Sequence, residues 1–125
     1  MKKIIQTPDA PKAIGPYSQA VEINGMLFIS GQIPIDPATG IFVEGGITEQ
    51  TEQVMKNIGA ILKEAGYTYD DVVKSTCLLN DMDHFAAMNE VYGKYYPKDP
   101  PARAAYGVVK LPMGALVEIE TIAAK

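Results

Sequence analysis

The chain has 125 residues, of which 47% are hydrophobic and 21% are charged, as in an ordinary globular protein. Its formal net charge of −4 argues against a surface that binds nucleic acid through bulk positive charge, so we do not expect a nucleic-acid partner. A single cysteine excludes an intrachain disulfide framework, and no signal peptide or membrane span is visible. We therefore expect residues 1–125 to form a single domain in the cytoplasm.

The N-terminal part of the chain predicts strands and a loop. Residues 2–6 form a candidate edge strand. Asn24-Gly25 separates two apolar runs, 20–23 and 26–30, and this pattern is a strong signal of a β-hairpin. Residues 33–46, with two turn signals, predict a loop.

Two helices and one strand are expected in the middle of the chain. Thr48 has the side chain of an N-cap, and helical spacing of apolar residues continues to Gly66, which would end this helix. Residues 72–79 have apolar side chains on both faces, which predicts a central strand. A second helix would be capped by Asp83 and stopped by Pro97.

The last third of the chain predicts an antiparallel hairpin, because two extended runs, 100–110 and 116–123, flank a turn. The resulting order β, β, β, α, β, α, β, β predicts an α+β fold, with a mixed sheet and both helices on one of its faces. The other face would have apolar side chains and no cover from the chain itself. We therefore expect that face to form an oligomer interface.

Charged residues on these last strands are candidates for a functional site. Arg103 would stand among small apolar neighbours, and Glu118 and Glu120 would share a partly apolar face. A guanidinium can bind a carboxylate or phosphate through two parallel hydrogen bonds, and a partly buried glutamate can activate a water molecule. The residues alone leave open whether Arg103 is a ligand clamp or a surface arginine in an ion pair, and whether the glutamates are simply solvated.

Other motifs give weaker signals. Tyr17 and Ser30 stand near Gly15 and Gly31, where the glycines serve either turn geometry or close approach of a ligand to the backbone. His84 is the only histidine, so we expect no metal site. The chain lacks a nucleophile elbow and a phosphate-binding glycine loop, so we expect no cofactor.

Several motifs together resemble the RidA/YjgF family of reactive-intermediate deaminases, from about residue 5 to the C-terminus. The motifs stand in family order: Ala13-Ile14-Gly15-Pro16-Tyr17-Ser18-Gln19, Ser30-Gly31-Gln32-Ile33-Pro34, Asn89-Glu90-Val91-Tyr92, and Pro101-Ala102-Arg103 with Leu111-Pro112 and Val117-Glu118-Ile119-Glu120. The resemblance implies a chorismate-mutase-like fold and a homotrimer. In that trimer the sheets would form a central β-barrel with three clefts between subunits.

The resemblance also implies hydrolysis of enamines and imines such as 2-aminoacrylate and 2-iminobutanoate, which pyridoxal-phosphate-dependent dehydratases produce, to 2-keto acids and ammonia. No cofactor would be needed. Arg103 would hold the substrate carboxylate, and Glu118 would position the water. The other implied site residues are Tyr17, which lines the cleft, Ser30 and Gly31 beside it, Asn89 near its mouth, and Ala105, where many family members have a cysteine and whose backbone N–H could bind the carboxylate.

Two alternative functions stay open. A non-catalytic trimer that senses 2-keto acids or binds protein partners would need Arg103 but not Glu118. Some relatives are described as ribonucleases or translation inhibitors. The acidic composition counts against that activity, as does the lack of a histidine and lysine pair for RNA cleavage.

Overall fold

The chain folds into strands and two α-helices, and the computed structural model describes all residues, 1–125. In chain order the elements are β1 (Lys3–Ile5), β2 (Ala20–Ile23), β3 (Met26–Gln32), β4 (Ile35–Asp36), β5 (Ile41–Phe42), α1 (Ile47–Ala65), β6 (Val72–Leu79), α2 (Phe85–Tyr95), β7 (Ala102–Gly107) and β8 (Val117–Ala124). Short 3₁₀ turns precede β6, α2 and β8. No helix combines the length and the hydropathy that crossing a membrane requires.

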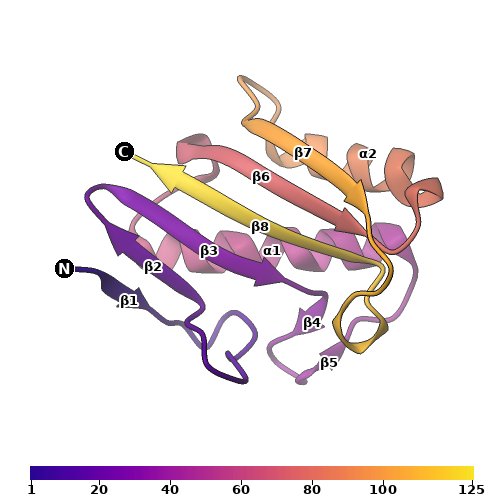
Figure 1. Ribbon diagram of the computed structural model, residues 1–125, viewed down its shortest axis with the longest axis horizontal. Coiled ribbons are helices and arrows are strands. Elements are labelled where there is room, and N and C mark those ends of the chain that lie inside the picture. The colour runs from indigo at the N-terminus through magenta and orange to yellow at the C-terminus, as the bar shows by residue number, and fades with distance from the viewer.

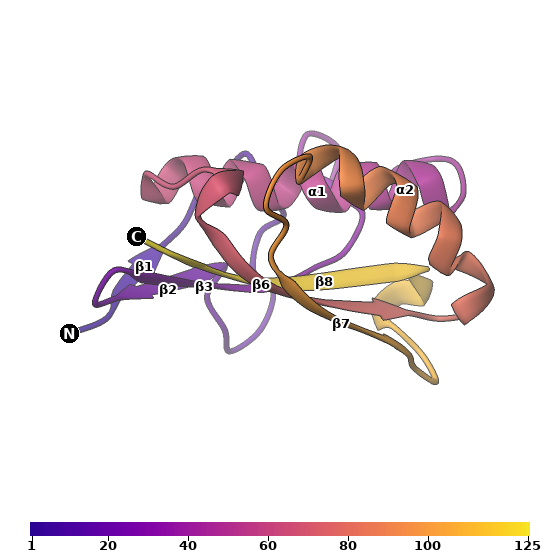
Figure 2. The same ribbon diagram turned by 90° about the horizontal axis from the view of Figure 1, so that it is seen from above.

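Six strands form one sheet in the order β1-β2-β3-β8-β6-β7 (Figure 1). All neighbouring strands are antiparallel except β6 and β7, which are parallel, so the sheet is mixed. Both helices cover the same face of this sheet, as Figure 2 shows from above. These features confirm the predicted α+β architecture. The expected homotrimer with its central barrel stays a prediction.

The predicted C-terminal hairpin is wrong. β8 does not pair with β7 but lies between β3 and β6, while β7 occupies the edge of the sheet beside β6. Two causes explain this topology. The helix α2 links β6 to β7 as a crossover, which makes these strands parallel. In addition, alternate residues of β8, beginning with Val117, are buried, so this strand gains more from a central position under the helices.

The first helix begins two residues earlier than predicted. Gly46, not Thr48, is its N-cap, because the carboxylate of Glu49 reaches back and accepts a hydrogen bond from the backbone N–H of Gly46 at 2.9 Å. The helix ends as predicted at Gly66, whose φ of +84° is the left-handed conformation that glycine tolerates best.

Asp83, the predicted cap of the second helix, does not cap it, because the N-cap position of α2 is His84, whose side chain makes no capping hydrogen bond. Asp81, not Asp83, caps the 3₁₀ turn that precedes α2, and its carboxylate accepts the N–H of Asp83 at 2.8 Å. The helix ends at Tyr95, before Pro97, as expected.

Two further predictions concern the N-terminal half. The hairpin at Asn24-Gly25 is confirmed, since both residues have positive φ, +51° and +75°, as a tight two-residue turn requires. The predicted loop at 33–46 contains the small antiparallel pair β4 and β5, which the sequence did not indicate.

The hydrophobic core lies between the sheet and the two helices. Its largest fully buried side chains include Leu27 from β3, Ile58 and Leu62 from α1, Met88 from α2 and Ile119 from β8. The opposite face of the sheet keeps apolar side chains in contact with solvent. Those exposed by more than a third include Ile4, Phe28 and Tyr106. This apolar face agrees with the expectation of an oligomer interface.

Candidate active site

The sequence-predicted site residues lie on opposite faces of the sheet. Residues directly opposite each other on neighbouring strands point to the same face. Arg103 is paired with Ser75, whose side chain is only 1% exposed on the helix-covered face. Glu118 is paired with Leu78, which follows the buried Cys77 on β6. Because successive side chains of a strand point to opposite faces, Leu78 and Glu118 both point to the uncovered face. One chain therefore cannot bring Arg103 and Glu118 together in one site.

The first group, which we call the arginine group, consists of Arg103, Ala105 and Asn89. Arg103 lies on the edge strand β7, and its Nη1 donates a hydrogen bond of 2.6 Å to Oδ1 of Asn89 on α2. Ala105 lies two residues further along the same face of β7 and packs against the core. The arginine and the asparagine line a groove of about 400 Å³ at this edge, together with Pro100 and Pro101.

Two aromatic rings that the sequence analysis did not assign to the site complete the surroundings of the arginine. The Cζ atom of Arg103 lies 5.0 Å from the ring centroid of Tyr92 and 5.4 Å from that of Phe85. Phe85, Asn89 and Tyr92 stand at positions i, i+4 and i+7 of α2, so they form one stripe. That spacing was visible in the sequence, but an aromatic stripe usually indicates core.

The second group, which we call the glutamate group, consists of Glu118, Gly31, Ser30 and Tyr17. The register between β3 and β8 shifts between Ile29 and Gln32, where Ser30 and Gly31 form a β-bulge. A methyl group added to Gly31 would lie only 2.9 Å from the carboxyl carbon of Glu118 and would collide with its Oε2. The absence of a side chain at Gly31 thus makes room for the carboxylate.

Glu118 has the electrostatic character of a possible proton acceptor and donor. Burial of its half-buried side chain raises the pKa of the carboxyl above its usual value, and the charge of nearby Glu120 raises it further. A carboxyl with a raised pKa releases and recovers a proton closer to neutral pH than a solvated one. No nearby cation offsets this rise in the pKa of Glu118.

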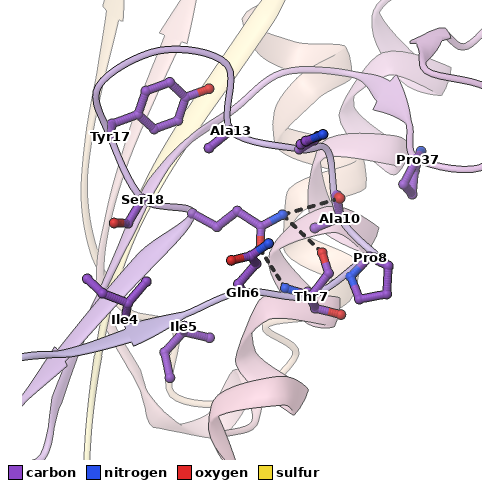
Figure 3. A pocket seen from close by; sticks show the side chains of 12 residues that line it. Ile4, Ile5, Gln6, Thr7, Pro8, Ala10, Ala13, Tyr17, Ser18 and Pro37 are labelled. Carbon is purple, nitrogen blue, oxygen red and sulfur yellow. Dashed lines mark hydrogen bonds between the residues drawn. The ribbon is translucent and has the colours of Figure 1, made fainter.

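Tyr17 lies on a loop that a buried glutamine holds in place. The side-chain Nε2 of Gln19 donates to the carbonyl groups of Thr7, Ala10 and Pro11 at 2.8–3.3 Å, and its Oε1 accepts the N–H of Thr7 at 2.7 Å. Figure 3 draws the bonds to Thr7 and Ala10 as dashed lines and shows Tyr17 at the bend of the loop. Gln19 carried no signal of this role in the sequence.

Tyr17 and Gly31 line one cavity, of about 260 Å³, with Ile14 and Met113 at its wall. The hydroxyl of Ser30 donates to the carbonyl of Ser18 at 2.6 Å, so it fastens the loop to β3. Tyr17 is 53% exposed and is accessible to a ligand. The structure therefore places four of the predicted site residues close together, namely Tyr17, Ser30, Gly31 and Glu118.

Metal ligands do not gather anywhere in the structure, since no three histidine, cysteine, aspartate or glutamate side chains stand in a metal-binding arrangement. His84 lies alone in the turn before α2. The candidate site residues are a guanidinium on one face of the sheet and a carboxyl with a raised pKa on the other.

Comparison with known proteins places this chain among close relatives. The family model described as Endoribonuclease L-PSP matches residues 7–125. A RutC family protein of Pyrococcus horikoshii is 56% identical over 125 residues, covering 100% of this chain and 99% of that protein. The 2-iminobutanoate/2-iminopropanoate deaminase of Mus musculus is 51% identical over 123 residues, covering 98% of this chain and 91% of that protein.

A solved structure has the same fold as this chain. A Rid family protein from Yersinia pestis, described as a protein of unknown function, superimposes with a TM-score of 0.95 at 50% identity, and the match covers 100% of both chains. The chain belongs to the endoribonuclease L-PSP family, which confirms the resemblance to the RidA/YjgF proteins that its motifs indicated.

Proposed function

We propose that this protein hydrolyses reactive enamines and imines, such as 2-aminoacrylate and 2-iminobutanoate, to 2-keto acids and ammonia. The observation that carries the proposal is the half-buried Glu118 carboxyl, which has a raised pKa and fits against the bare backbone of Gly31. The deaminase name of the mouse relative, at 51% identity, supports the same reaction.

The reaction needs only a carboxylate clamp and an activated water. Arg103 binds the carboxylate of the imino acid through the fork of its guanidinium. Glu118 accepts a proton from water as the water oxygen adds to the imine carbon. The same carboxyl passes this proton to the imine nitrogen, which gives a carbinolamine with a hydroxyl and an amino group on one carbon. The carboxyl then takes the hydroxyl proton and delivers it to the amino nitrogen, so that the C–N bond breaks, ammonia leaves and the carbonyl group of the keto acid forms. An enamine enters this sequence after protonation of its terminal carbon gives the imine.

We further propose that each site lies between two subunits of a homotrimer. Arg103 and Glu118 point to opposite faces of one sheet, so a cleft that contains both must take the arginine group from one chain and the glutamate group from its neighbour. The uncovered apolar face, which also carries Glu118, is the surface by which the subunits would pack around a central barrel.

The activity is tested by generating an imine in place with an amino-acid oxidase or threonine dehydratase and measuring release of ammonia and keto acid. We expect the wild-type protein to accelerate release, and Arg103→Ala to remove the acceleration without unfolding the protein. If a folded wild-type oligomer gives no acceleration, the deaminase proposal fails. The protein would then be a ligand-binding or regulatory trimer.

Mixing two inactive variants tests the shared site. Arg103→Ala keeps Glu118, and Glu118→Gln keeps Arg103, so a mixed oligomer contains some clefts with both groups intact. With random assembly from equal amounts, about one quarter of the clefts are intact, and about one quarter of the wild-type activity should return. A site built within one chain would recover nothing, which would contradict the shared cleft.

The family name also raises the possibility of RNA cleavage. The net charge of −4 and the position of the single histidine, alone before α2, do not favour it. RNA binding that weakens steeply with salt would indicate phosphate contacts and would argue for that activity instead. We expect no such salt-dependent binding.

A further inference from the structure

We propose that Phe85 and Tyr92 are positioning residues, whose rings hold the guanidinium of Arg103 in one fixed orientation while Asn89 sets its rotation. The substrate part of this inference rests on the proposed function, because it takes a carboxylate as the ligand of the arginine. The orientation itself is a property of the free protein and can be measured without any substrate.

The spacing of the stripe on α2 places the guanidinium between the two rings. Phe85 and Tyr92 are seven residues apart, which corresponds to about 10.5 Å along the helix axis. The Cζ atom of Arg103 lies 5.4 Å from one ring centroid and 5.0 Å from the other. Asn89 stands between them in the stripe and accepts the Nη1 hydrogen at 2.6 Å. Three side chains of one helix therefore contact a single guanidinium.

These contacts restrict the motion of the Arg103 side chain. Arg103 lies on the edge strand β7 and is exposed, so its long side chain would otherwise sample many rotamers. Aromatic rings attract a guanidinium and favour a defined orientation of its plane. A guanidinium has five N–H donors, and the bond to Asn89 uses one, which leaves the others for a carboxylate.

The ring of Tyr92, and not its hydroxyl, is the part that the inference needs. The hydroxyl oxygen is buried and has no hydrogen-bond partner, whereas the ring contacts the arginine. The two contributions can therefore be separated with conservative variants. Tyr92→Phe keeps the ring, and Tyr92→Leu removes it. Phe85→Leu removes the other ring at a half-buried position.

Arg103 is the only arginine in the chain, so arginine-labelled protein gives one guanidinium spectrum without any assignment step. In the wild-type protein we expect separate Nη signals, shifted by the neighbouring rings, because rotation is restricted. Tyr92→Phe should keep this spectrum. Tyr92→Leu and Phe85→Leu should each collapse it toward the single averaged signal of a free arginine.

Affinity for 2-oxobutanoate, a stable 2-keto acid, measured by calorimetry on the assembled protein, gives the second readout. Each leucine variant should weaken binding by about two- to thirtyfold, the range expected for loss of a cation–π contact. Tyr92→Phe should bind within about twofold of the wild type. Tyr95→Leu removes a ring of the same helix that does not contact Arg103, so it controls for general loosening of α2.

Unchanged spectra and unchanged affinity in both leucine variants would overturn the inference, as would an equal effect of Tyr95→Leu. If Tyr92→Leu does not fold, the test of the inference rests on Phe85→Leu alone, because Phe85 is only half-buried. If the wild-type protein neither binds keto acids nor hydrolyses imines, the proposed function fails. The guanidinium spectra still decide whether the rings position Arg103.

Discussion

Replacement of Gly31 by alanine should displace the Glu118 carboxyl and leave the rest of the protein in place. The added methyl group would lie 2.9 Å from the carboxyl carbon of Glu118 and 3.1 Å from its Cγ, and it would overlap with Oε2. The φ of Gly31 is not in the left-handed region, so alanine meets no backbone penalty. The atoms that must move belong to the end of a flexible side chain, which can rotate away.

The size of the effect follows from this geometry. Ordinary van der Waals contact begins at 3.4 Å, so the carboxyl carbon must shift by at least about 0.5 Å, and the nearer oxygen must shift further. A misplacement of about 1 Å in a reacting group costs on the order of a hundredfold in rate. We therefore expect turnover to fall by about ten- to a hundredfold, which is roughly 1.4–2.7 kcal/mol in activation free energy. The stability should change by less than about 1 kcal/mol.

The assay measures ammonia release from an imine generated in place, together with the affinity for 2-oxobutanoate and the midpoint of thermal unfolding. Affinity should change little, because the arginine group remains intact. Gly46→Ala is the matched control, since a methyl group there would meet no atom within 4 Å. Turnover within twofold of the wild type, or a loss of activity that is matched by a loss of stability, would refute the role of this contact.

Three further results are expected. Because burial raises the pKa of Glu118, the folded protein holds the carboxyl proton of Glu118 more tightly than the unfolded chain does. The stability that this proton contributes is fully present below the unfolded pKa near 4.5, and it is lost as the pH rises through the folded pKa. Glu118→Gln should therefore gain stability relative to the wild type as the pH rises across that window in urea titrations, and a constant difference would contradict the buried carboxyl. Gln19→Leu should lower the free energy of unfolding by about 2–4 kcal/mol, because its hydrogen-bond partners in the loop 7–11 are buried, and a loss under about 1 kcal/mol would show that water replaces the amide. Phenylglyoxal should abolish turnover in step with the modification of Arg103, the single arginine, and 2-oxobutanoate should protect; modification without inactivation would exclude Arg103 as the clamp.

Local signals predicted the elements of the fold well. Asn24-Gly25 specifies a two-residue hairpin by backbone conformation alone, and Gly66 ends α1 for the same reason. The pairing of β7 and β8 could not be predicted in this way. A period of two shows which residues of a strand share a face, but it does not show which strand becomes the neighbour. That choice depends on α2, whose crossover places β7 at the edge.

The same limit applies to the candidate site. Residue types and motif order indicated Arg103 and Glu118, and the alternation along β8 showed that Glu118 does not face the same way as Val117. Their placement on opposite faces follows only from the register with β6, which pairs Arg103 with Ser75 and Glu118 with Leu78. The sequence thus indicated the candidate residues, and the sheet register places them on opposite faces of one chain, which is the basis for proposing a site shared between two subunits.

The position of β7 has a consequence for how the protein would lose activity. This strand is hydrogen-bonded to the sheet on one side only, and none of its residues is fully buried. Elements of this kind open at a lower free energy than the core strands around β8. Fraying of β7 would release the guanidinium from α2 while the core stays folded. Inactivation by heat or denaturant should then precede global unfolding, and spectroscopic signals from the helices would overestimate the range of conditions in which the protein works.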